Sequence, residues 1–153
     1  MNALFNKELL NKVTTTAAGI DTLPVRLAVG GIFAAHGAQK LFGWFGGYGL
    51  EGTAGWMASI GLEPGLLLAA LAGGAEFFGG LLLIVGLLVR PAALMLAITM
   101  VVAIVTVHFE HGLFMSNNGY EYALALLVVS IGFIARGAGS LSIDRAWQRN
   151  LSN

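Results

Sequence analysis

Long apolar runs separated by short polar stretches dominate the chain and predict membrane-spanning helices. A helix that crosses a bilayer needs about 20 mostly apolar residues. The clearest run, residues 65–89, contains a single charge, Glu76, and is closed by Arg90-Pro91. Proline is favoured in the first turn of a helix, so Pro91 is expected to open the next run, residues 91–109. Because so little separates these two runs, they predict a tight helical hairpin.

Two weaker runs complete the pattern. Residues 23–45 are interrupted by four polar or charged side chains, namely Arg26, His36, Gln39 and Lys40. Residues 119–135 are short, because about 15 apolar residues rise only ~22 Å, less than the ~30 Å hydrocarbon core. We therefore predict an all-α membrane protein, a four-transmembrane-helix bundle over residues 23–136, with an N-terminal segment 1–22 and a tail 137–153.

The distribution of lysine and arginine predicts the orientation of this bundle. Seven of these residues fall on one side of the predicted spans: Lys7, Lys12, Arg26, Arg90, Arg136, Arg145 and Arg149. The opposite side has only Lys40. Since positive charge is retained in the cytoplasm, both termini are predicted to be cytoplasmic, and the loops 44–64 and 108–119 to be external.

The N-terminal segment is predicted to lie on the membrane surface. Residues 2–19 contain Glu8 and no long apolar core, so no cleavable signal is expected. Phe5, Leu9 and Val13 follow helical spacing, which favours a short amphipathic helix at the bilayer surface.

Composition supports a membrane protein and excludes several classes. Apolar residues make up 57% and charged residues 10% of the chain, against about 25% charged in a typical soluble domain. Eight basic residues are balanced by eight acidic ones, so no field attracts nucleic acid. The chain has no cysteine, which excludes disulfides, thiol redox centres, zinc ribbons and cysteine-ligated iron–sulfur clusters. Any electron chemistry must depend on another group.

The polar residues inside the spans are predicted to form one layer. At ~1.5 Å per residue from the cytoplasmic side, the depths are ~16 Å for His36, ~20 Å for Glu76, ~21–23 Å for Gln39 and Lys40, ~22 Å for Glu121 and ~25 Å for His108. This layer lies between the midplane and the outer interface. Arg26 and Arg90 lie instead at the cytoplasmic rim, where a structural or interfacial role is expected.

Glu76 is the strongest candidate for a functional residue. An unpaired charge at the helix centre costs about 2.5–3.5 kcal/mol on insertion scales, so this side chain should face inward. Its role is either functional or a structural hydrogen bond. His36 and Lys40 are one helical turn apart and can face the same side. His36 is either a satisfied core residue or part of the site, and Lys40 either joins the site or extends to the outer interface.

Metal and haem sites are not expected. His108 and His111 could share a metal, but the loop offers no further histidine and no evident second ligand shell. A haem between His36 and His108 would need ligands facing each other across one ring, whereas their depths differ by ~9 Å.

The polar positions occur in a pattern that resembles a known family. The pattern runs through residues 26–43, Glu76-Phe77-Phe78-Gly79-Gly80, Gly86-Leu87, Arg90, His108, Gly119-Tyr120-Glu121 and residues 137–144. It is similar to the DoxX family of small bacterial inner-membrane proteins and covers residues 23–145. The resemblance implies a four-helix membrane bundle and an association with redox, because the family is similar to the DoxD subunit of thiosulfate:quinone oxidoreductase. The matching positions are Arg26, His36, Lys40, Glu76, Arg90, His108 and Glu121.

The sequence hypothesis is a multi-pass bacterial inner-membrane subunit of a redox or oxidative-stress-linked system. It would bind a quinone or similar small molecule in the outer polar layer, either as a catalytic or as an accessory subunit, with Glu76 and His36 as catalytic residues. Gln39, Lys40, His108 and Glu121 would bind the ligand. Since no internal redox group is evident, a protein partner or bound cofactor would supply electrons, and a homo-oligomer is also conceivable. The alternatives are a carrier for small solutes or protons and a non-enzymatic membrane scaffold.

Overall fold

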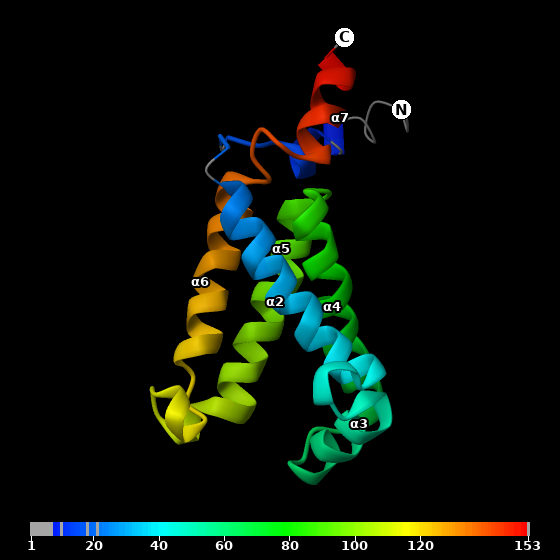
Figure 1. Cartoon of the computed structure of the whole chain (residues 1–153), viewed down its shortest axis with the longest axis vertical. Coiled ribbons are helices and arrows are strands. Elements are labelled where there is room, and N and C mark those ends of the chain that lie inside the picture. Colours follow the sequence, from blue (N-terminus) through cyan, green and yellow to red (C-terminus); the bar gives the residue numbers. More distant parts are fainter. Residues whose placement is uncertain (1–7, 10, 18, 21, 153) are drawn as a thin grey trace.

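Four long helices form the body of the protein (Figure 1). They are α2 (Thr22–Phe42), α4 (Gly65–Val85), α5 (Val89–Ala103) and α6 (Glu121–Arg136). The shorter elements are η1 (Trp44–Gly46), α3 (Gly49–Ser59), the π-helical turn η2 (Ile104–His108), η3 (Phe109–His111), η4 (Met115–Asn117) and α7 (Ile143–Ser152). This computed structural model describes residues 8–9, 11–17, 19–20 and 22–152, and every regular element in that part of the chain is helical.

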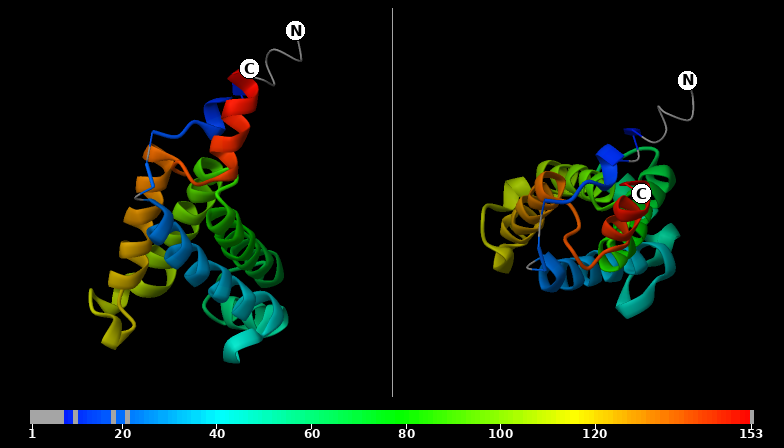
Figure 2. Two further views of the ribbon diagram at one scale, coloured as in Figure 1. Left: turned by 45° about the horizontal axis from the view of Figure 1, so that its top comes forward. Right: turned by 90° about the horizontal axis from the view of Figure 1, so that it is seen from above.

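The long helices form two pairs, α2 with α4 and α5 with α6 (Figure 1). The pairs meet at one end of the molecule, called the closed end here, and diverge toward the other, the open end (Figure 2). α7 and the short helical segment near the N-terminus lie at the closed end. η1, α3 and the 109–120 loop form two separate lobes at the open end.

The apolar core joins the two pairs and extends along α5 and α6 to the cavity. α5 contributes Val89, Ala93, Leu96 and Met100, and α6 contributes Ala123, Leu126 and Phe133. α2 and α4 add Val29, Phe33 and Leu83. Phe33, Leu83 and Leu96 are among the largest fully buried side chains, so this is where packing fixes the two pairs.

Glycines set the close approach of α2 and α4. A Cβ on Gly37 would lie 2.6 Å from Phe77 Cα, and a Cβ on Gly80 would lie 2.6 Å from the Gly30 carbonyl oxygen. Real side chains do not fit at such distances, so the crossing requires glycine on both helices. Gly31 lies on α2 but meets nothing within 4 Å, which makes it a natural control.

Buried polar residues tie the chain together at the closed end. The Asp144 carboxylate accepts hydrogen bonds from the backbone N–H groups of Leu88 (2.7 Å) and Val89 (3.0 Å), and so caps the start of α5. Burial raises the pKa of Asp144, and these two N–H groups and Arg26 offset part of that rise. Arg26 donates to the carbonyls of Ala138 and Leu141.

Arg90 makes a second connection at this end. Its Nε donates to the Thr15 carbonyl at 2.7 Å, and its Nη1 donates to the Ile134 carbonyl at 2.6 Å. Arg26 and Arg90 therefore donate hydrogen bonds to backbone carbonyls of three chain segments at the closed end.

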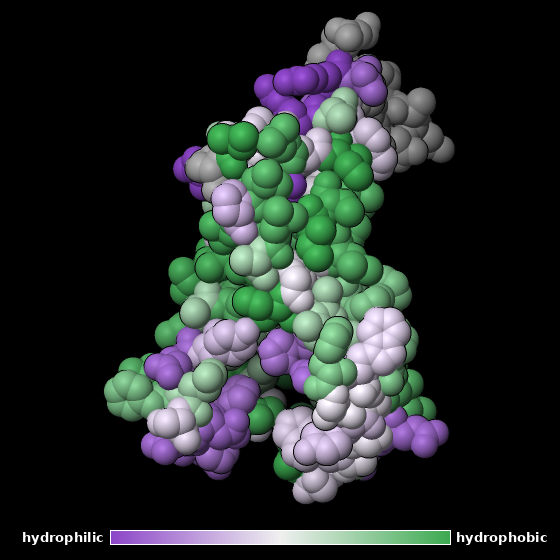
Figure 3. All heavy atoms as spheres, viewed as in Figure 1, coloured by the Kyte–Doolittle hydropathy of each residue, from purple (hydrophilic) through white to green (hydrophobic). Residues whose placement is uncertain are grey.

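The outer surface of the helices is strongly apolar. Among the described residues, two helices are long and apolar enough to cross a membrane, Gly65–Val85 and Val89–His111. Only 33% and 28% of their most apolar stretches are buried in the protein, so most of that surface faces outward, unlike a core helix of a soluble domain. Figure 3 shows this apolar surface between polar groups at the two ends.

The observed elements differ from the sequence expectation in three places. α5 begins two residues before Pro91, and its last turn is π-helical rather than regular. The loop 44–64 contains an 11-residue helix, α3, that the glycine-rich sequence did not indicate. Residues 8–9 and 11–14 are helical, while Phe5, part of the predicted surface helix, lies outside the described residues.

Candidate functional site

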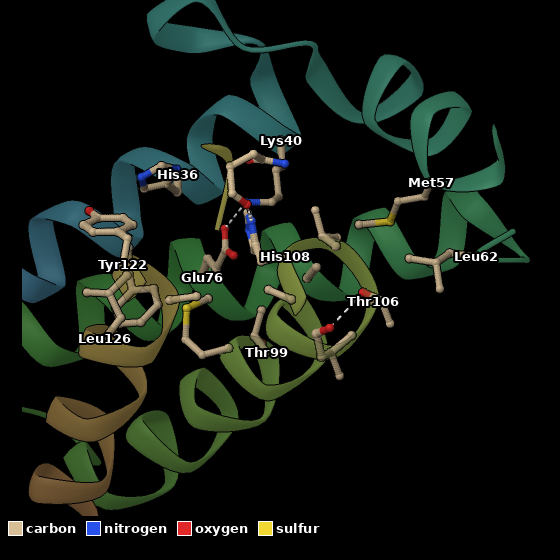
Figure 4. A pocket seen from close by; sticks show the side chains of 18 of the residues that line it. His36, Lys40, Met57, Leu62, Glu76, Thr99, Thr106, His108, Tyr122 and Leu126 are labelled. Carbon is tan, nitrogen blue, oxygen red and sulfur yellow. Dashed lines mark hydrogen bonds and ion pairs between the residues drawn. The ribbon is translucent and has the colours of Figure 1, made fainter. Parts of the chain in front are cut away.

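A cavity of about 570 Å³ lies between the two helix pairs in their diverging half (Figure 4). This is within the ~300–1,000 Å³ range of small-molecule sites. Its polar side chains include His36, Lys40, Glu76, Thr99, Thr106, His108 and Tyr122. The rest of the lining is mainly apolar, with Phe33, Met57, Leu62, Met100, Val102, Ala103, Val107, Met115 and Leu126.

The centre of the polar wall is an ion pair between α2 and α4. Lys40 Nζ lies 2.5 Å from Glu76 Oε2. The Glu76 side chain is only 4% exposed, whereas the Lys40 side chain is 26% exposed. The glycine crossing of α2 and α4 brings these helices close enough for the pair to form, so Lys40 pairs within the cavity instead of extending to the interface.

His36 lies one turn before Lys40, on the side of α2 that faces α6. Its ring centroid is 6.1 Å from that of Tyr122, and the rings are tilted by 52°. Figure 4 shows both rings at the same side of the cavity. His36 is exposed to this space, so it is not a packed core histidine.

The π-helical turn brings His108 into the same cavity. In a regular helix, His108 would lie about 180° around the axis from Thr99, nine residues earlier. Both residues nevertheless line the cavity, because the wider turn Ile104–His108 rotates the end of the helix. Such π turns are frequent at functional sites.

A backbone contact fixes the His108 ring. Its Nδ1 lies 2.8 Å from the Asn118 carbonyl oxygen. A carbonyl can only accept, so Nδ1 carries the proton and Nε2 of the neutral ring is left as an acceptor. The hydroxyls of Thr99 and Thr106 donate to the carbonyls of Met95 and Val102, so they too present acceptor lone pairs.

Two predicted ligand-binding residues lie outside the cavity lining. Gln39 Nε2 donates to the Phe45 carbonyl at 3.3 Å and holds the η1 turn. Glu121 Oε1 accepts the backbone N–H of Met115 at 2.7 Å and closes the loop that carries Asn118. Both residues support the lobes around the cavity.

Side chains that could ligate a metal ion are dispersed over the described part of the structure. Within the described part of the chain, no three His, Cys, Asp or Glu side chains gather into a possible metal site. His111 Nδ1 lies 3.0 Å from the Val107 carbonyl oxygen and does not line the cavity.

Fold and site together define a class: an all-helical protein with membrane-capable helices around a partly apolar cavity. A partly buried Lys–Glu pair and two histidines mark the polar wall of that cavity. This arrangement can hold a small molecule, donate hydrogen bonds from Lys40 and exchange protons through Glu76 and His36.

The chain belongs to the DoxX family, whose profile it matches over residues 22–109. It is 34% identical over 125 residues to a Bacillus subtilis protein described as "putative oxidoreductase CatD". The aligned region covers 82% of this chain and 85% of that protein. It is 40% identical over 73 residues to a Haemophilus influenzae protein described as an "uncharacterized protein". That match spans 48% of each chain, about half the length of the relative. No solved structure matches the chain. The family resemblance inferred from the sequence is thus confirmed.

Proposed function

We propose that the protein is a multi-pass protein of the bacterial inner membrane, in which the four long helices form a transmembrane bundle. The described segments near both chain ends lie at the closed end, as an even number of spans requires. Arginines gather there as well, at positions 26, 90, 136, 145 and 149. By the positive-inside rule the closed end is cytoplasmic and the open end, with the cavity, is external.

We further propose that this bundle is the membrane subunit of a redox or oxidative-stress-linked system, and that its cavity binds a quinone or similar small molecule. One observation carries this proposal: an apolar cavity of about 570 Å³ has a Lys40–Glu76 ion pair and two histidines in its wall. The description of the Bacillus relative as an oxidoreductase agrees with it.

The residues would take distinct parts in quinone chemistry. Lys40 and His36 donate hydrogen bonds to the carbonyl oxygens, which become more negative as electrons arrive. Reduction of a quinone to a quinol takes two electrons and two protons. A partner protein or bound cofactor supplies the electrons, and Glu76 and His36 pass protons to the ring oxygens. The chain is then an accessory subunit whose work is binding and proton transfer.

A ligand-dependent melting experiment tests this proposal. A benzoquinone with one isoprenoid unit should raise the melting temperature in detergent, because a ligand at 100 times its Kd stabilises the folded state by about 2.7 kcal/mol. The shift should disappear in His36→Ala and Glu76→Gln. It should persist in the matched controls His111→Ala and Glu110→Gln, whose side chains do not line the cavity.

Two outcomes would point elsewhere. A shift that survives both site variants would place the quinone outside the cavity. Absence of any quinone effect, combined with solute or proton uptake by reconstituted vesicles, would favour the carrier alternative.

A further inference from the structure

The cavity has a strong chemical asymmetry. Its charged side chains, Lys40 and Glu76, meet on the α2–α4 side, with His36 one turn away. Toward α3 and the end of α5 the lining carries no charged side chain and is mostly apolar, with Met57, Leu62, Val102, Ala103 and Val107 beside the neutral hydroxyls of Thr99 and Thr106. A ligand that fills the whole cavity therefore needs a polar part and an apolar part.

The apolar side of the cavity is also its opening. Tyr48, Trp56 and Met115 line the cavity and yet are 84%, 43% and 59% exposed. Tyr48 and Trp56 belong to the lobe formed by η1 and α3, and Met115 belongs to the lobe formed by residues 109–120. Figure 3 shows a hollow between these two lobes at the open end.

Exposed aromatic side chains mark the level of this opening. Trp44, Phe45 and Trp56 are exposed on the first lobe, and Phe109 and Phe114 on the second. Tryptophan concentrates at the membrane–water interface, so Trp44 and Trp56 favour a position of the opening near that interface in the proposed orientation.

From this asymmetry we infer that the ligand is an amphiphile dissolved in the membrane. Its flat polar head lies against Lys40 and Glu76, and its apolar tail passes Ala103 and Leu62 and leaves between the two lobes. This inference rests on the proposed quinone-type function and deepens it. Inside the cavity the tail exchanges the acyl region of the bilayer for a similarly apolar lining, so its burial there costs little. A wholly polar solute would gain nothing there and would lose its hydration.

The tryptophans provide a direct readout. The chain has three, and Trp56 lines the cavity, while Trp44 and Trp147 do not. Trp44→Phe/Trp147→Phe leaves Trp56 as the single reporter in the full-length protein. Quinones quench tryptophan fluorescence, so saturable quenching in nanodiscs gives an affinity for each probe. Two probes are compared at equal mole fraction in the lipid: 2,3-dimethoxy-5-methyl-1,4-benzoquinone, and the same head carrying a decyl chain.

At equal mole fraction in the lipid the two probes should bind with similar affinity, because the decyl chain exchanges one apolar environment for another. Ala103→Phe fills the apolar part of the cavity and should weaken binding of the decyl probe at least tenfold, whereas binding of the tail-free head should change less than twofold. The matched control Val101→Phe lies on the same helix, is exposed and does not line the cavity, so it should change neither. Leu62→Asn is a second variant, which replaces apolar with polar surface in the tail path and should weaken only the decyl probe.

The possible failures are distinguishable. An affinity for the decyl probe that stays unchanged in both Ala103→Phe and Leu62→Asn, or an equal loss for both probes, would overturn the amphiphile inference and leave the quinone proposal standing. Absence of saturable quenching by either probe would overturn the quinone site and, with it, this inference.

Discussion

Lys40→Met should destabilise the protein more than Glu76→Gln, because the two partners of the ion pair differ in exposure. The Glu76 side chain is 4% exposed and the Lys40 side chain 26%. Lys40→Met leaves a buried carboxylate without its partner, and breaking a buried pair in this way costs about 3–5 kcal/mol. Glu76→Gln leaves an ammonium that already reaches the cavity. The loss of stability caused by Glu76→Gln should lie between the cost of breaking a buried pair and the ~0.2–1 kcal/mol of exposed pairs, at roughly 1–2 kcal/mol.

The double variant Lys40→Met/Glu76→Leu is the decisive comparison. It removes both charges and fills the space with apolar atoms, so its stability should lie within about 1 kcal/mol of the parent. The assay is denaturant unfolding of the three variants, the single variant Glu76→Leu and the parent in detergent.

Two results would refute this reasoning. With Glu76→Leu as the matching single variant, losses of Lys40→Met and Glu76→Leu that simply add in the double variant would mean that the two charges do not interact in the folded protein. A larger loss for Glu76→Gln than for Lys40→Met would mean that the lysine, not the glutamate, is the buried partner.

Three further predictions concern the rest of the molecule. Gly37→Ala should destabilise the protein by about 1–3 kcal/mol because the added methyl meets backbone atoms of α4, while Gly31→Ala should be neutral or stabilising by up to about 1 kcal/mol; both are read by thermal unfolding. Burial raises the pKa of Asp144 from its ordinary 3.8, so its contribution to stability is full below pH 3.8 and is lost as the pH rises through the folded-state pKa. The stability of the parent relative to Asp144→Asn should therefore fall with rising pH across that window, and an opposite slope would contradict it. Because the chain has no cysteine, Ser116→Cys should label with an impermeant thiol reagent in intact spheroplasts and Asn150→Cys should not; the reverse pattern would invert the proposed orientation.

The rise per residue along each predicted span suggested that the polar residues gather in one layer, and His36, Lys40, Glu76 and His108 do line one cavity. The direction of each side chain could not be predicted from the sequence. Gln39 has nearly the same depth as Lys40, yet neighbouring positions differ by about 100° around a helix, and Gln39 turns to the η1 loop. The direction in which a side chain points depends on which helices pack against each other, and this is a property of the tertiary structure.

Tyr122 and Glu121 show the same limit on α6. The sequence predicts Glu121 as a ligand-binding residue because it is charged, but its carboxylate accepts a backbone hydrogen bond within the loop before α6. The neighbouring Tyr122 lines the cavity instead. The direction of His108 could not be predicted either, because it depends on a π-helical turn. The mostly apolar sequence of that turn, residues 104–107, does not distinguish it from a regular helix. The only available signals were the aromatic character of Tyr122 and its position one residue after a predicted layer member.

The positions of the glycines determine how closely the helices approach each other, and they thereby determine where the ion pair of the site can form. Gly30, Gly37 and Gly80 let α2 and α4 cross at backbone contact, which brings Lys40 within 2.5 Å of Glu76. α5 and α6 pack on each other through larger side chains and diverge from the first pair, so the cavity opens beside the ion pair rather than through it. The Lys40–Glu76 ion pair therefore belongs to one closely packed helix pair, whereas His108 and most of the apolar lining belong to the second pair or to α3. Substitutions in the lining of α5 or α6 should thus alter the cavity without breaking the Lys40–Glu76 contact.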